Sequence, residues 1–138
     1  MLLNGKVKAD KWSFEITEKT NESDFLSSEI KNQIHKLVHN GEYRSYYTEP
    51  SEMCGKIFVF RVYFEKGILM SIDLSPASKS PSWDNVEKDA LLKEKVVNDE
   101  WLKSNFSIVA PANYQWGTLE SVLDQRGVSS SVVIRYRR

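Results

Sequence analysis

The stretch that decides the fold reads Lys56-Ile57-Phe58-Val59-Phe60-Arg61-Val62-Tyr63-Phe64, then Glu65-Lys66-Gly67, then Ile68-Leu69-Met70-Ser71-Ile72-Asp73-Leu74. Two runs of β-branched and aromatic residues flank a short polar connection with a glycine, which predicts a β-hairpin. The first run is apolar on both alternating faces, as is typical of a central strand with cover on each side. The second run is apolar on one face only, because Ser71 and Asp73 alternate with its apolar residues. The rest of the chain is therefore expected to pair with this hairpin or to lie across it.

Ahead of residue 42, the sequence predicts one strand and one helix. Trp12, Phe14 and Ile16 alternate with polar residues, which indicates a strand with one face on the core. From Asp24 the apolar residues recur at helical spacing, which predicts a helix that closes at Asn40-Gly41. The apolar stripe of this helix consists of Leu26, Ile30, Ile34, Leu37 and Val38.

After the hairpin, the sequence predicts a second helical layer. Asp84 and Glu87 have the spacing of a capping box, and Trp83 stands just ahead of them. A fresh cap near Asn98-Asp99 also permits two helices between 84 and 106, and the residues leave that choice open. One side of the first helix carries Val86, Ala90, Leu91 and Val97.

Three further strands complete the pattern. One covers the tyrosine-rich segment 42–48, and the other two, 114–123 and 128–136, form an antiparallel pair. Strands that cluster along the chain, with helices between the clusters, favour an α+β fold over a doubly wound parallel one. We therefore expect a single α+β domain over residues 1–138, in which a mainly antiparallel sheet of about five to six strands packs against two or three helices.

Composition argues against several classes of protein. The chain is 41% hydrophobic and 28% charged, which is not the composition of a disordered segment. No apolar run approaches the roughly 20 residues that span a bilayer, and the first residues do not resemble a secretory signal, so we expect a cytoplasmic protein. Cys54 is the single cysteine, which excludes an internal disulfide and a cysteine-rich metal site.

The charges balance overall but not locally. Nineteen basic and nineteen acidic residues give a formal net charge of zero, so no long-range attraction to nucleic acid or anionic membrane is expected. Residues 84–100 include six carboxylates and three lysines, whereas the stretch from 126 onward carries four arginines and no acid. The protein is therefore expected to have an acidic face and a basic end.

No residue pattern names a reaction. His35 and His39 lie one helical turn apart in the predicted helix, but no third metal ligand accompanies them. Cys54 lies in an acidic loop, Glu52-Met53-Cys54-Gly55, which does not activate a thiol, and we interpret it as a small apolar filler. Carboxylates are abundant without a motif that selects a pair, and the glycines are too scattered for a phosphate-binding loop. We expect no catalytic, cofactor-binding or metal-binding residues.

The C-terminal third resembles small bacterial immunity proteins encoded beside polymorphic or contact-dependent growth inhibition toxins. The residues that carry the likeness are Tyr114-Gln115-Trp116-Gly117-Thr118-Leu119-Glu120-Ser121-Val122-Leu123-Asp124, the stretch from Gly127 to Tyr136, Val97-Asn98-Asp99-Glu100-Trp101-Leu102, and Asn105-Phe106. The resemblance implies a cytoplasmic, non-catalytic protein that binds one cognate toxin domain and covers its active or substrate-binding surface. Immunity proteins against nucleases are often acidic, whereas this chain is neutral, so its partner need not be a strongly basic nuclease.

A toxin-binding surface would combine acids that steer the encounter with a few aromatic anchors. The segment 84–100 is the place where acids concentrate, and an exposed tryptophan or tyrosine would supply the anchor. The candidate residues are Asp84, Glu87, Asp89, Glu94, Asp99, Glu100, Trp83, Tyr46 and Tyr47.

Two other functions stay open at this point. A small-molecule-binding or enzymatic α+β domain would have a cavity between the sheet and the helices. A nucleic-acid-binding adaptor would join Arg135 and Arg137 to exposed tyrosines on one surface.

Overall fold

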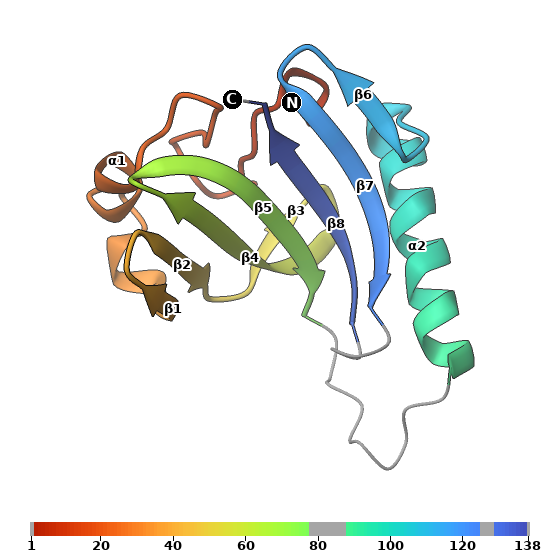
Figure 1. Ribbon diagram of the computed structural model, residues 1–138. Helices are drawn as coiled ribbons and strands as arrows, with labels where there is room; N and C mark the ends of the chain where they lie inside the picture. The colour runs from red at the N-terminus through yellow and green to blue at the C-terminus, as the bar shows by residue number, and fades with distance from the viewer. Residues whose placement is uncertain (1, 78–87, 125–128, 138) are drawn as a thin grey trace.

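The computed structural model describes residues 2–77, 88–124 and 129–137, and within them the chain forms one antiparallel sheet with two α-helices (Figure 1). The strands are β1 (Ile34–Asn40), β2 (Tyr43–Thr48), β3 (Ser51–Met53), β4 (Lys56–Glu65), β5 (Ile68–Pro76), β6 (Ala112–Tyr114), β7 (Gly117–Asp124) and β8 (Ser129–Tyr136). The helices are α1 (Glu22–Leu26) and α2 (Lys88–Phe106), with 3₁₀ turns at Leu2–Asn4 and Lys31–Gln33. The α+β class is confirmed, with more strands than the sequence predicted.

The sheet is a meander with a single crossover. Its order is β1-β2-β4-β5-β8-β7-β6, with β3 paired to β4 off this path, and every pair is antiparallel. The predicted hairpin is confirmed as β4 and β5 near the centre of the sheet. Its turn, Lys66-Gly67, has positive φ at both residues (52° and 77°), which a two-residue type I′ turn requires.

The core lies on one face of the sheet. Along β4 the alternate residues Phe58, Phe60, Val62 and Phe64 are buried. The irregular N-terminal segment covers this face where Trp12 meets Phe60, with ring centroids 4.8 Å apart. Helix α2, which runs alongside β7 in Figure 1, covers it where Trp101 meets Phe58, also at 4.8 Å.

The opposite face of the sheet is not covered by any helix among the described residues. Ile57, at the start of β4, is 53% exposed, so the prediction of cover on both sides of this strand is wrong. We call this surface the open face and define it by the register of the four central strands. Its residues are Val59, Arg61 and Tyr63 of β4, Ser71, Asp73 and Ser75 of β5, Ser131, Val133 and Arg135 of β8, and Thr118, Glu120 and Val122 of β7. Ser131 and Val133 are buried nonetheless, at 9% and 5% exposed.

The predicted helix from Asp24 to Asn40 is wrong. Only α1 and a 3₁₀ turn form there, and residues 34–40 extend as the edge strand β1. Gly41 has φ +63° and joins β1 to β2, so Asn40-Gly41 belongs to a hairpin turn and not to a helix end. Pairing with the tyrosine-rich β2 outweighs the local helical spacing.

Two other sequence expectations need correction. Residues 12–16 form no strand, although Trp12 and Ile16 do face the core; the backbone there makes only an isolated bridge between Val7 and Ile16. Residues 88–106 form one continuous helix, but its buried side carries Asn98, Trp101, Leu102 and Phe106, whereas Val97 is exposed. None of the helices in the described part of the chain has the length and apolar character needed to cross a membrane.

Candidate functional site

The nine residues proposed from the sequence do not form one surface. Trp83, Asp84 and Glu87 lie outside the described residues, and Asp89 stands in the first turn of α2. The other three acids, Glu94, Asp99 and Glu100, follow on α2, whereas the two tyrosines are on β2 at the far end of the sheet.

The two tyrosines of β2 differ in exposure. Tyr46 is 3% exposed, and its hydroxyl donates to Glu22 Oε2 over 2.8 Å. Burial, with Glu22 second, raises the pKa of Tyr46 to about 12. Tyr46 is therefore a core residue and not a surface anchor. Tyr47 is exposed and stacks on His35, with ring centroids 5.1 Å apart.

The outer surface of α2 carries an apolar groove with charged walls. The groove has a volume of about 260 Å³ and lies between the helix and the segment that leaves it. Val96 is 53% exposed and Val109 is 72% exposed, so both present aliphatic surface to solvent. We call this feature the α2 groove; it is lined by Val96, Asp99, Glu100, Lys103, Ile108, Val109 and Ala110.

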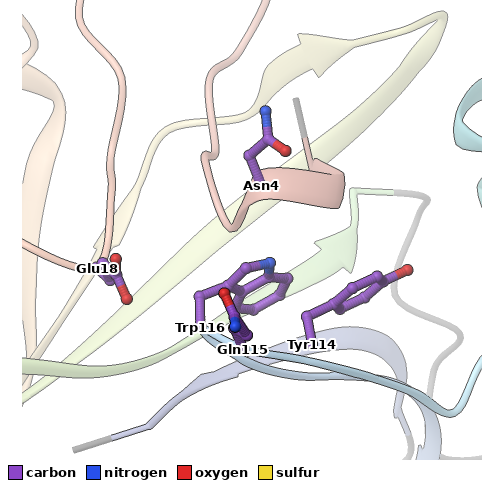
Figure 2. Close-up of a pocket in the computed structure, with 5 residues that line it drawn as sticks. All are labelled: Asn4, Glu18, Tyr114, Gln115 and Trp116. Carbon is purple, nitrogen blue, oxygen red and sulfur yellow. The ribbon is translucent and has the colours of Figure 1, made fainter.

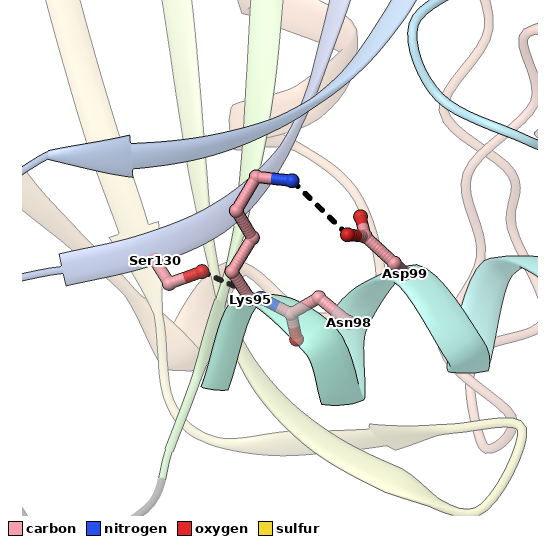
Figure 3. Close-up of polar contacts among 4 residues, drawn as sticks. All are labelled: Lys95, Asn98, Asp99 and Ser130. Atoms are coloured by element: carbon pink, nitrogen blue, oxygen red, sulfur yellow. Dashed lines mark hydrogen bonds and ion pairs between the residues drawn. The ribbon is translucent and has the colours of Figure 1, made fainter. Parts of the chain in front are cut away.

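Two of the predicted acids stand at this groove. Asp99 Oδ2 accepts a hydrogen bond from Lys95 Nζ over 3.0 Å, one helical turn away (Figure 3). Its other oxygen, Oδ1, is buried without a hydrogen-bond donor. Glu100 is exposed and has Lys103 beside it on the groove wall. An apolar floor with carboxylates at its edge suits an aliphatic or aromatic side chain with a basic neighbour.

A buried polar network fixes α2 on the sheet behind the groove. Asn98 is 0% exposed, accepts from Lys56 Nζ over 2.6 Å, and donates to Ser130 Oγ over 3.2 Å (Figure 3 shows the latter contact). Burial lowers the pKa of Lys56, and Glu94 opposes that shift. Glu94 is not among the residues that line the α2 groove.

The open face carries a second group of charged residues. Arg61 and Asp73 are direct cross-strand partners, and Tyr63 donates its hydroxyl to Asp73 Oδ2 over 3.2 Å. Burial raises the pKa of Asp73, which the Tyr63 hydrogen bond and the charges of Arg61 and Arg135 oppose. Arg135 Nε lies 3.7 Å from Glu120 Oε2. Each arginine of the open face thus stands near a carboxylate, which weakens its attraction for a nucleic acid backbone.

A polar pocket lies near the two ends of the chain, away from the α2 groove. It has a volume of about 450 Å³ and is lined by Asn4, Glu18, Tyr114, Gln115 and Trp116 (Figure 2). The ring of Trp116 already stacks on Tyr114, with 5.2 Å between centroids, and a Cβ on Gly5 would lie 2.7 Å from its Cδ2. The tryptophan therefore offers little free ring surface to a ligand.

The described part of the chain holds no cluster of histidine and cysteine side chains that could bind a metal ion. His35 and His39 lie on strand β1, and no three His, Cys, Asp or Glu side chains among the described residues come together where they could hold a metal ion. Cys54 is exposed in the β3–β4 turn with φ +49°, so its interpretation as a core filler is wrong. Partial desolvation by the surrounding chain, with the charge of Asp10 second, raises the pKa of its thiol.

Sequence reasoning missed the aliphatic part of the α2 groove. Val96 was not distinguished from its neighbours because the buried stripe was placed on Val97, one position along the helix. Placing Leu102 and Phe106 in the core would have set the correct helical phase, because residues four positions apart share a face and these two lead back to the buried Asn98. Val109 had no sequence signal, since it comes from the irregular segment after α2.

Comparisons with protein-family models, with curated proteins and with solved structures found no match for this chain.

Proposed function

We propose that this protein is a non-catalytic immunity protein that binds a cognate bacterial toxin domain in the cytoplasm and covers its active or substrate-binding surface. The observation that carries the proposal is the α2 groove, where exposed aliphatic side chains lie next to carboxylates. Clustered exposed apolar side chains with a polar rim are typical of protein-binding sites. The resemblance of the C-terminal third to immunity proteins supports the same function.

In the α2 groove, different residues would supply the affinity for the toxin and the electrostatic steering of the encounter. Val96 and Val109 would lose most of their exposed area to a partner side chain, and such central apolar contacts carry most of the affinity of an interface. Glu100 and Asp99 stand at the edge, where charges accelerate association more than they strengthen the complex. The toxin segment that fits has an apolar side chain with a lysine or arginine beside it.

A binding measurement with matched variants tests this proposal. The probe is the toxin domain encoded beside this gene, titrated into the full chain by calorimetry. Val96→Asp is expected to weaken binding about 30-fold or more, as at other interface hot spots. Val38→Asp is the matched control, because Val38 on β1 is exposed to a similar extent (56% against 53%) and lies far from α2. Equal affinities for the two variants would exclude the α2 groove as the binding site.

Small-molecule binding is the runner-up function. It is favoured by the polar pocket of Figure 2, where Asn4, Glu18 and Gln115 present hydrogen-bonding groups. Native mass spectrometry of the full chain purified from its own host is the test. A bound molecule that is lost in Gln115→Ala would favour this function over toxin binding, whereas the mass of the bare chain would count against it.

A further inference from the structure

The exposed side of α2 carries a row of residues at heptad spacing. Leu92, Val96, Asp99 and Lys103 recur every three or four positions, so they lie within about 60° of one another around the helix axis. The last three line the α2 groove, and Leu92, which is 43% exposed, continues the same line toward the start of the helix. We call these four residues the α2 stripe. The stripe is apolar in its first half and charged in its second.

We propose that the toxin element bound by the α2 stripe is an amphipathic helix that lies along α2 for about three turns. This inference rests on the proposed function, because the partner is the toxin domain, and it adds the kind of element that the toxin presents. Apolar residues at heptad spacing are the pattern by which one helix packs on another. An amphipathic helix with its apolar face in a groove is a recurring mode of protein recognition.

The length of the stripe and its second wall both fit a helix. Leu92 and Lys103 are about 16 Å apart along the axis, because each helical residue adds about 1.5 Å. A partner helix spans this distance with about 11 residues, whereas an extended strand needs about five. Val109, 72% exposed in the segment that leaves α2, stands on the other side of the groove. The partner helix would therefore contact aliphatic side chains on both sides.

The charges of the stripe argue against a second copy of α2 as the partner. Two parallel copies would bring Asp99 against Asp99 and Lys103 against Lys103. An antiparallel pair centred between Val96 and Asp99 would place Leu92 against Lys103. Centred between Leu92 and Val96, it would bring Asp99 level with position 89, which is also an aspartate. Like charges that face each other across an interface weaken it, so the occupant is a different chain.

The same residues describe the chemistry of the partner helix. Two apolar side chains one turn apart would face Leu92 and Val96, and an acid would face Lys103. Asp99 Oδ2 already accepts a hydrogen bond from Lys95, so the exposed carboxylate of Glu100 is the better acceptor for a base on the partner. The partner helix therefore carries an apolar pair, then a lysine or arginine, then an acid.

The first test compares aspartate variants on the two exposed sides of α2. The probe is the toxin domain encoded beside this gene, titrated into the full chain by calorimetry. Leu92→Asp is expected to weaken binding about tenfold or more, in addition to the loss expected for Val96→Asp. Val97→Asp is the matched control, because Val97 is 49% exposed on the same helix but lies about 100° around the axis from Val96. Its affinity is expected to equal that of the wild-type chain, and circular dichroism checks that all three variants fold.

The second test measures the spacing of the toxin residues that meet the stripe. A photoreactive benzoylphenylalanine is placed at position 92 in one chain and at position 103 in another, and each chain is irradiated with the toxin domain. Mass spectrometry then identifies the toxin residues that are captured. Capture sites about 11 residues apart in the toxin sequence are expected for a helix, and sites about five residues apart for a strand.

The possible results separate the partner helix from the proposed function. Weakened binding by Val96→Asp with wild-type affinity for Leu92→Asp would overturn the helix and leave toxin binding at the groove intact. Capture sites about five residues apart would do the same, as would a Val97→Asp variant that binds as weakly as Leu92→Asp. Wild-type affinity for all three variants, or a wild-type chain that does not bind the toxin domain, would overturn both proposals.

Discussion

Lys56 at the start of the central strand β4 donates to Asn98 in the middle of α2, with 2.6 Å between Nζ and Oδ1. Asn98 in turn donates to Ser130 of β8. A single fully buried amide therefore ties the helix to two strands that are far apart in the sequence. It also sets which side of α2 faces the sheet, and hence which side carries the groove.

Replacing this amide should loosen the helix. Asn98→Ala leaves the Lys56 ammonium and the Ser130 hydroxyl without their partner in a buried site, and such losses cost about 1–3 kcal/mol of unfolding free energy. Val97→Ala is the matched control, since Val97 is exposed on the same helix and should change stability by less than about 0.5 kcal/mol. Urea unfolding followed by circular dichroism measures both. Equal effects would show that the network does not hold α2.

Because the core lies on one face of the sheet, truncating side chains on the two faces of β4 should cost different amounts of stability. Phe60 is fully buried between the sheet and Trp12, so Phe60→Ala should cost about 3–5 kcal/mol. Ile57 lies on the same strand but points to the other side, and Ile57→Ala should cost less than about 1 kcal/mol. Thermal unfolding of the two variants gives the comparison. A cost for Ile57→Ala close to that for Phe60→Ala would mean that this end of the sheet is covered on both sides.

Asp73 should make the stability of the chain depend on pH. Burial raises its pKa in the folded state, so the native carboxyl keeps its proton at a pH where the unfolded one has lost it. The stabilising effect of this proton is complete at low pH and is lost as pH rises from the unfolded pKa through the folded one. Asp73→Asn removes the ionisation, so its unfolding free energy relative to wild type should increase as the pH rises above the unfolded aspartate pKa of about 3.9.

A second variant sharpens the pH test. Tyr63→Phe removes the hydrogen bond that favours the ionised carboxyl, so the loss of stability with rising pH should be larger than in wild type. The measurement is urea unfolding at a series of pH values that starts below the unfolded aspartate pKa of about 3.9 and extends above it. Parallel pH profiles for wild type and Asp73→Asn would contradict the assignment.

The sequence predicted the central hairpin well because its signals were local. Two long β-branched and aromatic runs and a Lys66-Gly67 turn admit few other structures, and the C-terminal pair β7–β8 followed from the same kind of pattern. The prediction for segment 34–40 was wrong because the structure there depends on a partner distant from the local pattern. Its apolar residues fit a helix by spacing, and only pairing with β2 made it a strand.

The candidate site was predictable in part. The acids Asp99 and Glu100 do stand at the α2 groove, because charge density along a helix is visible in the sequence. The apolar floor was not visible, since it joins Val96 of the helix to Val109 of the segment beyond it. Tyr46 was misjudged because a strand residue reveals its face only through register, and here that face is the core.

Growth protection tests the central claim most directly. Host cells carry the toxin domain encoded beside this gene under an inducible promoter, together with the full chain or one of its variants. The wild-type chain and Val38→Asp are expected to preserve growth after induction, and Val96→Asp is expected to lose most of the protection. Cells that die equally with and without the wild-type chain would contradict the assignment as an immunity protein.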